Sequence, residues 1–415
     1  MSNEASFGGP ADLPAGVGGS AAGEFGPLVR TFGKAFGRRR GAGGGLAVYR
    51  HGEPLVHIWT GSTGSGVWSA ETGAIIFSAT KGITATVIHR LADRGLLDYA
   101  APVAEYWPEF GANGKAKITV RQVLTHSAGL GSLRPLAKDA AEVLDHRLME
   151  QRLAAAKPDR LLGIPAYHAL TFGWLCAGLA RAVTGHGMAE LFRTEVAEPL
   201  GIDGIHLGRP PAGAPIEYAI LSGGQLGSIG NPLTTRVLGR THAVPGAAGA
   251  AARSLFLPGL EEILEGADPP ILDTELGAGN AVCTADGLAA MYAALATGET
   301  PDGYEYLSAR TLKAMRRIES YRLDHGLFYA PMLWHLGYHS LPMPGAHGGF
   351  GHIGLGGSFG WADPRSGLAV GFVHNRLSVS LLPLDMSAAA WILPMTLNCL
   401  RTGRRTTALD IREAA

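Results

Sequence analysis

Cysteine is scarce in this sequence, and its scarcity bears on folding and on location. Only three cysteines occur among the 415 residues. They are odd in number and far apart, which argues against a disulfide framework and suits a reducing compartment. Each lies in or beside an apolar helical pattern, so Cys176, Cys283 and Cys399 are expected to pack in the core.

An excess of charge of either sign is also missing. The chain has 35 basic and 35 acidic residues, which gives a formal net charge of zero. Proteins that bind nucleic acid or anionic membranes generally present a basic surface, so neither partner is expected. One local basic run, Arg38–Arg40, is interpreted as a solvated turn before a strand.

Long apolar runs and cofactor motifs are lacking as well. No uncharged apolar run reaches about 18 residues, and the N-terminal segment has no secretory signal. No phosphate loop or dinucleotide fingerprint occurs between a strand and a helix. His335 and His339 are four residues apart, but the segment is strand-like and lacks the Glu of H-E-x-x-H. These absences predict a soluble, cytoplasmic protein without a membrane span, a metal or a cofactor.

Hydrophobic residues, counted with the aromatics and cysteine, make up 46% of the chain. They form periodic segments. Residues 45–61 contain two β-rich runs around a short polar turn, which is typical of a hairpin. Residues 78–98 carry apolar side chains on one helical face and have Gly95 at the expected stop, which predicts the clearest helix of the chain. Residues 118–201 are mostly helical.

The C-terminal part returns to strands. Strand-like runs at residues 332–339, 352–363 and 367–375 precede a final helix near 388–400. Strands near both chain ends predict one sheet completed by both termini, with helices inserted in the middle. The domain prediction comprises a flexible leader at 1–24, an α/β sheet domain at 25–110 and 276–415, a helical subdomain at 111–204, and a loop-rich insertion near the active site at 205–275.

A G-x-S-x-G pattern centred on Ser358 has the form of the nucleophile elbow of α/β-hydrolases. Such an elbow needs a helix directly after the serine. Here a turn containing Asp363, Pro364 and Gly367 follows, and then a strand-like run. We therefore predict that Ser358 lies in a hairpin strand and is not the nucleophile.

The stretch FSATK, Phe77–Lys81, has better chemistry for a nucleophile. Ser78 begins the clearest helix and Lys81 follows three residues later, so both side chains share one face. A serine hydroxyl needs a base, and a lysine serves when burial and positive surroundings lower its pKa. The helix N-terminus adds N–H groups that stabilise an alkoxide or an oxyanion.

Three motifs occur in the order typical of one superfamily. SATK at 78–81 resembles an S-x-x-K motif, YHA at 167–169 resembles Y-x-N, and HIG at 352–354 stands where relatives have K-T-G. On these motifs the chain resembles the serine β-lactamase and DD-peptidase superfamily, and within it the β-lactamase-like carboxylesterases called family VIII esterases. The resemblance runs from about Gly45 to Arg376. It implies an α+β fold in which an antiparallel sheet is flanked by helices and carries an inserted, mostly helical subdomain.

The resemblance also implies roles for individual residues. Ser78 would be the nucleophile, with Lys81 and Tyr167 as its proton network. The backbone amides of Ser78 and Leu355 would bind the oxyanion. His352 and Gly354 would border the substrate.

Two departures from the superfamily pattern favour an esterase over a resistance enzyme. Ala169 replaces the Asn of Y-x-N and His352 replaces the Lys of K-T-G. In relatives that retain them, these groups help bind or turn over β-lactams, the Lys by attracting the carboxylate of the drug. His352 could line the pocket, donate a hydrogen bond to the leaving group or satisfy a strand edge. His126 and Ser127 are expected to stabilise the helix entry beside the site.

The predicted function is hydrolysis of small-molecule carboxylic esters with short to medium acyl chains, through a Ser78 acyl-enzyme. Three alternatives use the same nucleophile: an acyltransferase, an amidase or peptidase, and a weak β-lactamase. A non-catalytic binding protein of the same fold is the alternative from a different class. The sequence leaves a homo-oligomer open.

Overall fold

The computed structural model describes residues 9–37, 41–223, 246, 249–250, 253–254, 257–340, 346, 348–377 and 386–413. The basic run at 38–40 and much of the predicted insertion at 205–275 lie outside these residues. The expected solvated turn at 38–40 and that part of the expected loop-rich insertion therefore fall outside the described part of the chain.

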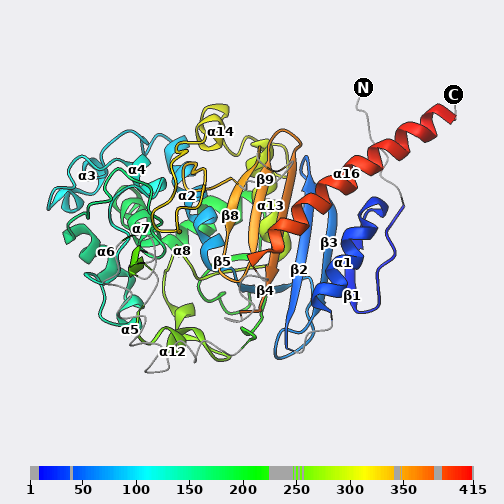
Figure 1. The fold of residues 1–415 in the computed structure, drawn as a ribbon, viewed down its shortest axis with the longest axis horizontal. Coiled ribbons are helices and arrows are strands. Elements are labelled where there is room, and N and C mark those ends of the chain that lie inside the picture. Colours follow the sequence, from blue (N-terminus) through cyan, green and yellow to red (C-terminus); the bar gives the residue numbers. More distant parts are fainter. Residues whose placement is uncertain are drawn as a thin grey trace.

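Both ends of the chain build one six-stranded antiparallel sheet (Figure 1). Its strands are, in spatial order, β1 (Val17–Ala21), β3 (Glu53–Gly61), β2 (Gly43–Arg50), β10 (Leu368–His374), β9 (Phe359–Asp363) and β8 (Phe350–Ile353). The pairing of β2 with β10 joins the N-terminal hairpin to the C-terminal strands. The prediction of one sheet completed by both termini is confirmed.

Alternation of large and small side chains decides which helices cover each face of the sheet. In β10, Val370 and Phe372 pack in the core formed with α1 (Gly26–Phe36) and α16 (Ala388–Glu413). Gly371 faces α13 (Ala285–Thr297), where an added Cβ would lie 2.3 Å from the Ala285 carbonyl oxygen. Because glycine takes up so little space on this face, α13 packs closely against the middle of the sheet.

The helical part lies on the other side of α13 from α1 and α16, beside strand β8 (Figure 1). Its central element is α2 (Thr80–Asp93), which is buried along most of its length. Around it lie α3 (Val103–Tyr106), η3 (Pro108–Gly111), α4 (Val120–Leu124), α5 (Ala140–Val143), α6 (His146–Ala155), α7 (Thr171–Thr184), α8 (Met188–Leu191), η4 (Phe192–Ala197), α9 (Glu198–Leu200), α12 (Leu260–Leu264), η6 (Pro270–Asp273) and α14 (Ala309–Arg316). None of the helices in the described ranges has the length and apolarity needed to cross a bilayer.

A second, smaller sheet leads the chain into the site. Its order is β5 (Ile205–Leu207), β7 (Ala281–Cys283), β4 (Thr72–Ile75) and β6 (Glu217–Tyr218). Strand β4 passes directly into the short 3-10 turn η2 (Phe77–Ala79) and then into α2. The sequence pattern gives no sign of this sheet, because its strands are only two to four residues long and show no clear alternation.

Two expectations from sequence are wrong. Residues 17–21 fall in the predicted flexible leader, yet they form β1 at the sheet edge. The sequence does not show this strand, because glycine stands where an alternating strand pattern would have a side chain. Gly18 has no space for one, since an added Cβ would lie 2.5 Å from the Trp59 indole.

The segment 332–339 was predicted to be a strand, but it forms only isolated bridges, among them Trp334 with His339. Leu333 and Gly337 have φ values of +51° and +80°, which interrupt an extended backbone. The side chains of His335 and His339 both hydrogen-bond to Ser340, the first to its hydroxyl and the second to its carbonyl oxygen.

The helix and cysteine predictions are confirmed. Helix α2 ends at Asp93, and Gly95 takes a φ of +75° just beyond it. Helix α16 begins at Ala388 as expected but continues to Glu413, well past the predicted end. All three cysteines are free and buried, as core packing requires.

Candidate active site

Ser78 lies in the 3-10 turn η2, at the point where strand β4 becomes helix α2. The preceding residue, Phe77, has a φ of +46°, a region that bulky side chains rarely adopt. Such strain persists only where the surrounding structure enforces it, and it is common at functional sites. The turn leaves Ser78 half-buried at the helix entrance.

Lys81 reaches Ser78 from the first turn of α2. Its Nζ lies 3.1 Å from Ser78 Oγ and donates a hydrogen bond to the Ala278 carbonyl oxygen at 2.8 Å. The side chain is completely buried. The expected juxtaposition of the two side chains on one helical face is therefore present.

The surroundings of Lys81 favour the neutral form of its amine. Burial lowers its pKa well below the usual lysine range, because a charged ammonium loses its hydration there. In the described part of the chain, no carboxylate forms an ion pair with Lys81. The Cys176 sulfur is the nearby group that favours the charged form, but burial raises the pKa of that thiol and leaves it protonated.

Tyr167 borders the same pair of side chains. Lys81 Nζ lies 4.9 Å from the centroid of the Tyr167 ring. Burial raises the pKa of the Tyr167 hydroxyl, and hydrogen bonding with the Ser78 side chain offsets part of this increase. The phenol therefore remains protonated and can pass a proton while it stays neutral overall.

Aromatic and imidazole rings enclose Tyr167 within a buried cluster. The Trp334 ring is stacked on Tyr167, with centroids 5.8 Å apart and planes 8° apart. The His126 ring lies 4.9 Å from Tyr167 and 4.3 Å from Trp334. His126 Nδ1 accepts a hydrogen bond from the His168 amide at 3.1 Å. His126 therefore packs against Tyr167 itself, which goes beyond the expected role in the helix entry.

Ser127, by contrast, hydrogen-bonds locally. Its hydroxyl lies 3.0 Å from the Thr125 hydroxyl and donates to the Gln122 carbonyl at 3.3 Å. These contacts stabilise the C-terminal end of α4, whereas the sequence predicted a role at a helix entry.

His352 lies on edge strand β8 and faces the cluster as a neutral ring. It is 3% exposed, and its Nδ1 donates to the Ile353 carbonyl oxygen at 2.9 Å. This leaves Nε2 as an acceptor, and within the described residues no partner reaches it. Burial lowers the pKa of His352 well below its ordinary value, and the nearby His339 and Lys81 side chains also oppose a positive charge on this ring. In this tautomer Nε2 cannot donate a hydrogen bond to a leaving group.

Gly354 brings the end of β8 against the Ser78 turn. An added Cβ at Gly354 would lie 2.0 Å from the Ile76 carbonyl oxygen, so only glycine allows this approach. Leu355 follows at once, and in the described backbone its amide makes no hydrogen bond. A free N–H beside the Ser78 turn is what an oxyanion site would need.

Ser358 occupies a structural position. It lies in the connection between β8 and β9, directly before β9 rather than inside a strand as predicted. Its side chain is buried, and Oγ accepts a hydrogen bond from the His374 amide at 3.2 Å. A strand follows it instead of a helix, so the nucleophile-elbow geometry is absent, as expected.

Two residues of the cluster, Asp324 and Trp334, were missed by the sequence analysis. The Asp324 carboxylate accepts hydrogen bonds from the Tyr167 amide at 3.0 Å and from Trp334 Nε1 at 2.8 Å. Neither residue belongs to a motif with fixed spacing. No signal in the sequence distinguished them from other core residues.

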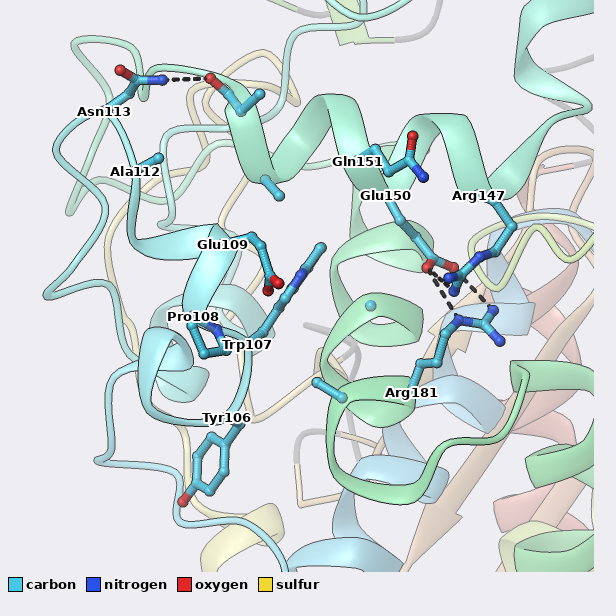
Figure 2. A pocket seen from close by; sticks show the side chains of 14 residues that line it. Tyr106, Trp107, Pro108, Glu109, Ala112, Asn113, Arg147, Glu150, Gln151 and Arg181 are labelled. Carbon is cyan, nitrogen blue, oxygen red and sulfur yellow. Dashed lines mark hydrogen bonds and ion pairs between the residues drawn. The ribbon is translucent and has the colours of Figure 1, made fainter.

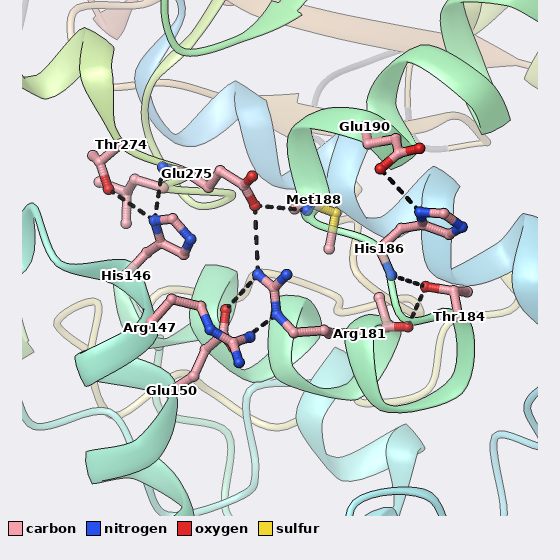
Figure 3. A network of polar contacts seen from close by, with 12 residues as sticks. His146, Arg147, Glu150, Arg181, Thr184, His186, Met188, Glu190, Thr274 and Glu275 are labelled. Carbon is pink, nitrogen blue, oxygen red and sulfur yellow. Dashed lines mark hydrogen bonds and ion pairs between the residues drawn. The ribbon is translucent and has the colours of Figure 1, made fainter.

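A second cluster, made of charged side chains around the buried Glu150, has a different construction. A cavity of about 720 Å³ between η3, α6 and α7 is lined by none of the predicted site residues (Figure 2). At its edge Glu150 bonds to Arg147 at 2.9 Å and to Arg181 at 3.2 Å. Arg181 also contacts Glu275 at 3.7 Å (Figure 3). The charges of this network are mutually paired, and it ties α6 and α7 to the segment before β7.

Comparisons with known proteins agree on one family. Residues 28–388 match the family described as Beta-lactamase. The esterase/β-lactamase LipL of Mycobacterium tuberculosis (strain ATCC 25618 / H37Rv) is 50% identical over 370 residues, covering 88% of this chain and 85% of LipL. The crystal structure of a family VIII carboxylesterase is 29% identical with a TM-score of 0.77, covering 92% of this chain and 99% of that one. A penicillin-binding protein homologue from Caulobacter crescentus is 27% identical with a TM-score of 0.74, covering 89% and 97%.

Proposed function

The chain belongs to the Beta-lactamase family, and on this premise we propose that it is a carboxylesterase that forms an acyl-enzyme on Ser78. The observation that carries the proposal is the 3.1 Å approach of Lys81 Nζ to Ser78 Oγ, in a site where the lysine has no counter-ion among the described residues. A neutral amine at that distance is a general base for the serine hydroxyl.

In the first step, Lys81 removes the Ser78 proton as Oγ attacks the ester carbonyl carbon. The Tyr167 hydroxyl shares the proton network. It delivers its proton to the leaving alcohol and receives in return the proton that Lys81 took from Ser78, so both groups are neutral again when the alcohol leaves. The amides of Ser78 and Leu355 stabilise the negative oxygen of the tetrahedral intermediate, each as a preorganised donor. Loss of the alcohol leaves an acyl group on Ser78.

In the second step, water attacks the acyl-enzyme with the same base network. Proton transfer from the water to Lys81 and return of a proton to Ser78 Oγ restore the resting enzyme. The carboxylic acid then leaves the site.

The substrate class follows from the neutral imidazole at the β8 edge. His352 and Gly354 border the substrate, and His352 supplies no positive charge to attract a carboxylate. We therefore expect neutral esters with short to medium acyl chains to react faster than β-lactams. β-Lactam hydrolysis is the second candidate, because the 50% identical relative is named as both an esterase and a β-lactamase.

Covalent labelling and substrate comparison test the proposal. After exposure to a fluorophosphonate, the intact mass of the wild type should increase by one covalently bound phosphonyl group. The mass of Ser78→Ala should not change, and Ser358→Ala should be labelled like the wild type. Hydrolysis of p-nitrophenyl acetate, butyrate and longer esters, measured beside nitrocefin, ranks the substrate classes. Full turnover by Ser78→Ala would overturn the assignment.

A further inference from the structure

The buried carboxylate of Asp324 has an unusual set of partners. Its side chain is fully buried, yet among the described residues no lysine or arginine forms an ion pair with it. Four N–H groups surround it instead. Oδ1 accepts from the amides of Tyr167 at 3.0 Å, Gly326 at 2.8 Å and Leu327 at 2.9 Å, and Oδ2 accepts from Trp334 Nε1 at 2.8 Å.

These bonds hold Tyr167 from two sides. One bond goes directly to the main chain of Tyr167. Another fixes the Trp334 indole, whose ring is stacked on the Tyr167 ring with planes 8° apart. Asp324 therefore constrains both the backbone and the ring plane of the tyrosine that borders Ser78.

The loop after Asp324 also packs against Tyr167. An added Cβ at Gly326 would lie 2.6 Å from the Tyr167 amide nitrogen, so the loop backbone packs directly on Tyr167. The His325 amide donates to the Pro165 carbonyl at 2.9 Å. Two segments more than 150 residues apart in sequence are thus joined at the tyrosine, with the Asp324 carboxylate at the junction.

We propose that Asp324 is a positioning residue for Tyr167, holding its hydroxyl within reach of Ser78 through the Tyr167 amide and the Trp334 indole. The inference rests on the proposed acyl-enzyme function. The negative charge of Asp324 also opposes ionisation of the Tyr167 hydroxyl, which keeps the phenol in the form that can donate a proton.

A double-mutant cycle tests this role. In Asp324→Asn, the Asn oxygen can still accept the three amide bonds, but its NH₂ group faces the Trp334 N–H and the two donors conflict. Trp334→Phe removes the indole donor and keeps a ring for stacking. We expect Asp324→Asn to lower kcat about 100-fold with KM changed less than about threefold, since small misplacements of a catalytic group cost this much. The double variant should recover part of kcat relative to Asp324→Asn.

Controls separate positioning from loss of stability. Glu150→Gln alters another buried, hydrogen-bonded carboxylate, and its kcat should stay at the wild-type value. If Asp324→Asn does not fold, Trp334→Phe alone should still lower kcat severalfold with an unchanged circular dichroism spectrum. Wild-type kcat in both Asp324→Asn and Trp334→Phe would overturn the inference, as would an equal kcat loss in Glu150→Gln.

Fluorophosphonate labelling distinguishes this failure from failure of the proposed function. Labelling of wild type but not of Ser78→Ala supports the acyl-enzyme, whatever Asp324→Asn does. If labelling also proceeds in Asp324→Asn at the wild-type rate, only the Asp324 role is overturned.

Discussion

Lys81 and Glu150 are both buried ionisable side chains beside helix α7, but their neighbours differ. Glu150 is held by Arg147 and Arg181, so its charge has partners on two sides (Figure 3). Lys81 has a carbonyl oxygen, a serine hydroxyl and a tyrosine ring around it, and no carboxylate among the described residues. Burial favours the neutral form of both groups. For Glu150, Arg147 opposes this shift and the pKa rises to about 7, whereas no carboxylate among the described residues opposes the lowering of the Lys81 pKa.

The largest expected effect comes from removing the unpaired amine. Lys81→Met should lower kcat/KM for p-nitrophenyl butyrate by at least about a thousandfold, because the general base is lost. Lys81→Arg should be as inactive, because a guanidinium does not deprotonate in proteins. Lys115 is the matched control: it is also fully buried and bonded to carbonyl oxygens, including Ala112 at 2.8 Å. Lys115→Met should keep wild-type kcat/KM, and comparable losses in both variants would contradict the role of Lys81.

The dependence of activity on pH should report the Lys81 proton. Burial lowers the Lys81 pKa, and only the neutral amine accepts the Ser78 proton. Activity is therefore lost as pH falls through this pKa and regained as pH rises, by about tenfold per pH unit on the acid limb. We expect kcat/KM to reach its plateau at a pH well below the ordinary pKa of lysine. A plateau reached only above pH 10 would mean that Lys81 is charged in the resting enzyme.

The paired cluster should respond in stability rather than in activity. Glu150→Ala leaves two arginines without their shared carboxylate and should lower the free energy of unfolding by about 3 kcal/mol. Its kcat, measured well below the melting temperature, should equal that of the wild type. Denaturant unfolding and steady-state kinetics on one preparation check both parts. A large kcat loss with unchanged stability would place Glu150 in the catalytic network instead.

The smallest effect should be the stability change in Lys81→Met. A neutral amine has no charge pairing to lose. The variant loses the hydrogen bonds to Ser78 and Ala278, worth about 1 kcal/mol each, but it also removes a lysine whose lowered pKa costs stability at neutral pH, and the two effects offset each other. The free energy of unfolding should therefore change much less than in Glu150→Ala. A loss of 3 kcal/mol or more would indicate that Lys81 is a paired charge in the folded protein.

The parts of the site that were predicted are those encoded by local spacing. Ser78 and Lys81 stand three residues apart on a helix, so their proximity follows from helical geometry. Ser358 was set aside for the same kind of reason, because turn residues follow it where an elbow needs a helix. The family membership predicted from the three motifs is confirmed by the match over residues 28–388.

The parts that were not predicted depend on contacts between distant segments. Asp324 bonds to Tyr167 across 157 positions of sequence, and Trp334 stacks on the same tyrosine from a segment that resembled a strand. Strand β1 was hidden because glycines occupy the positions where neighbouring side chains leave no space.

By itself, the sequence determined the two-ended sheet, the central helix and the serine–lysine pair on its first turn, since each follows from local periodicity and spacing. Only the tertiary structure decided that the pKa of Lys81 is lowered and that Tyr167 is held beside Lys81 and Ser78. The physical reason is that pKa depends on burial and on the absence of a counter-charge, and both arise only when remote segments pack together.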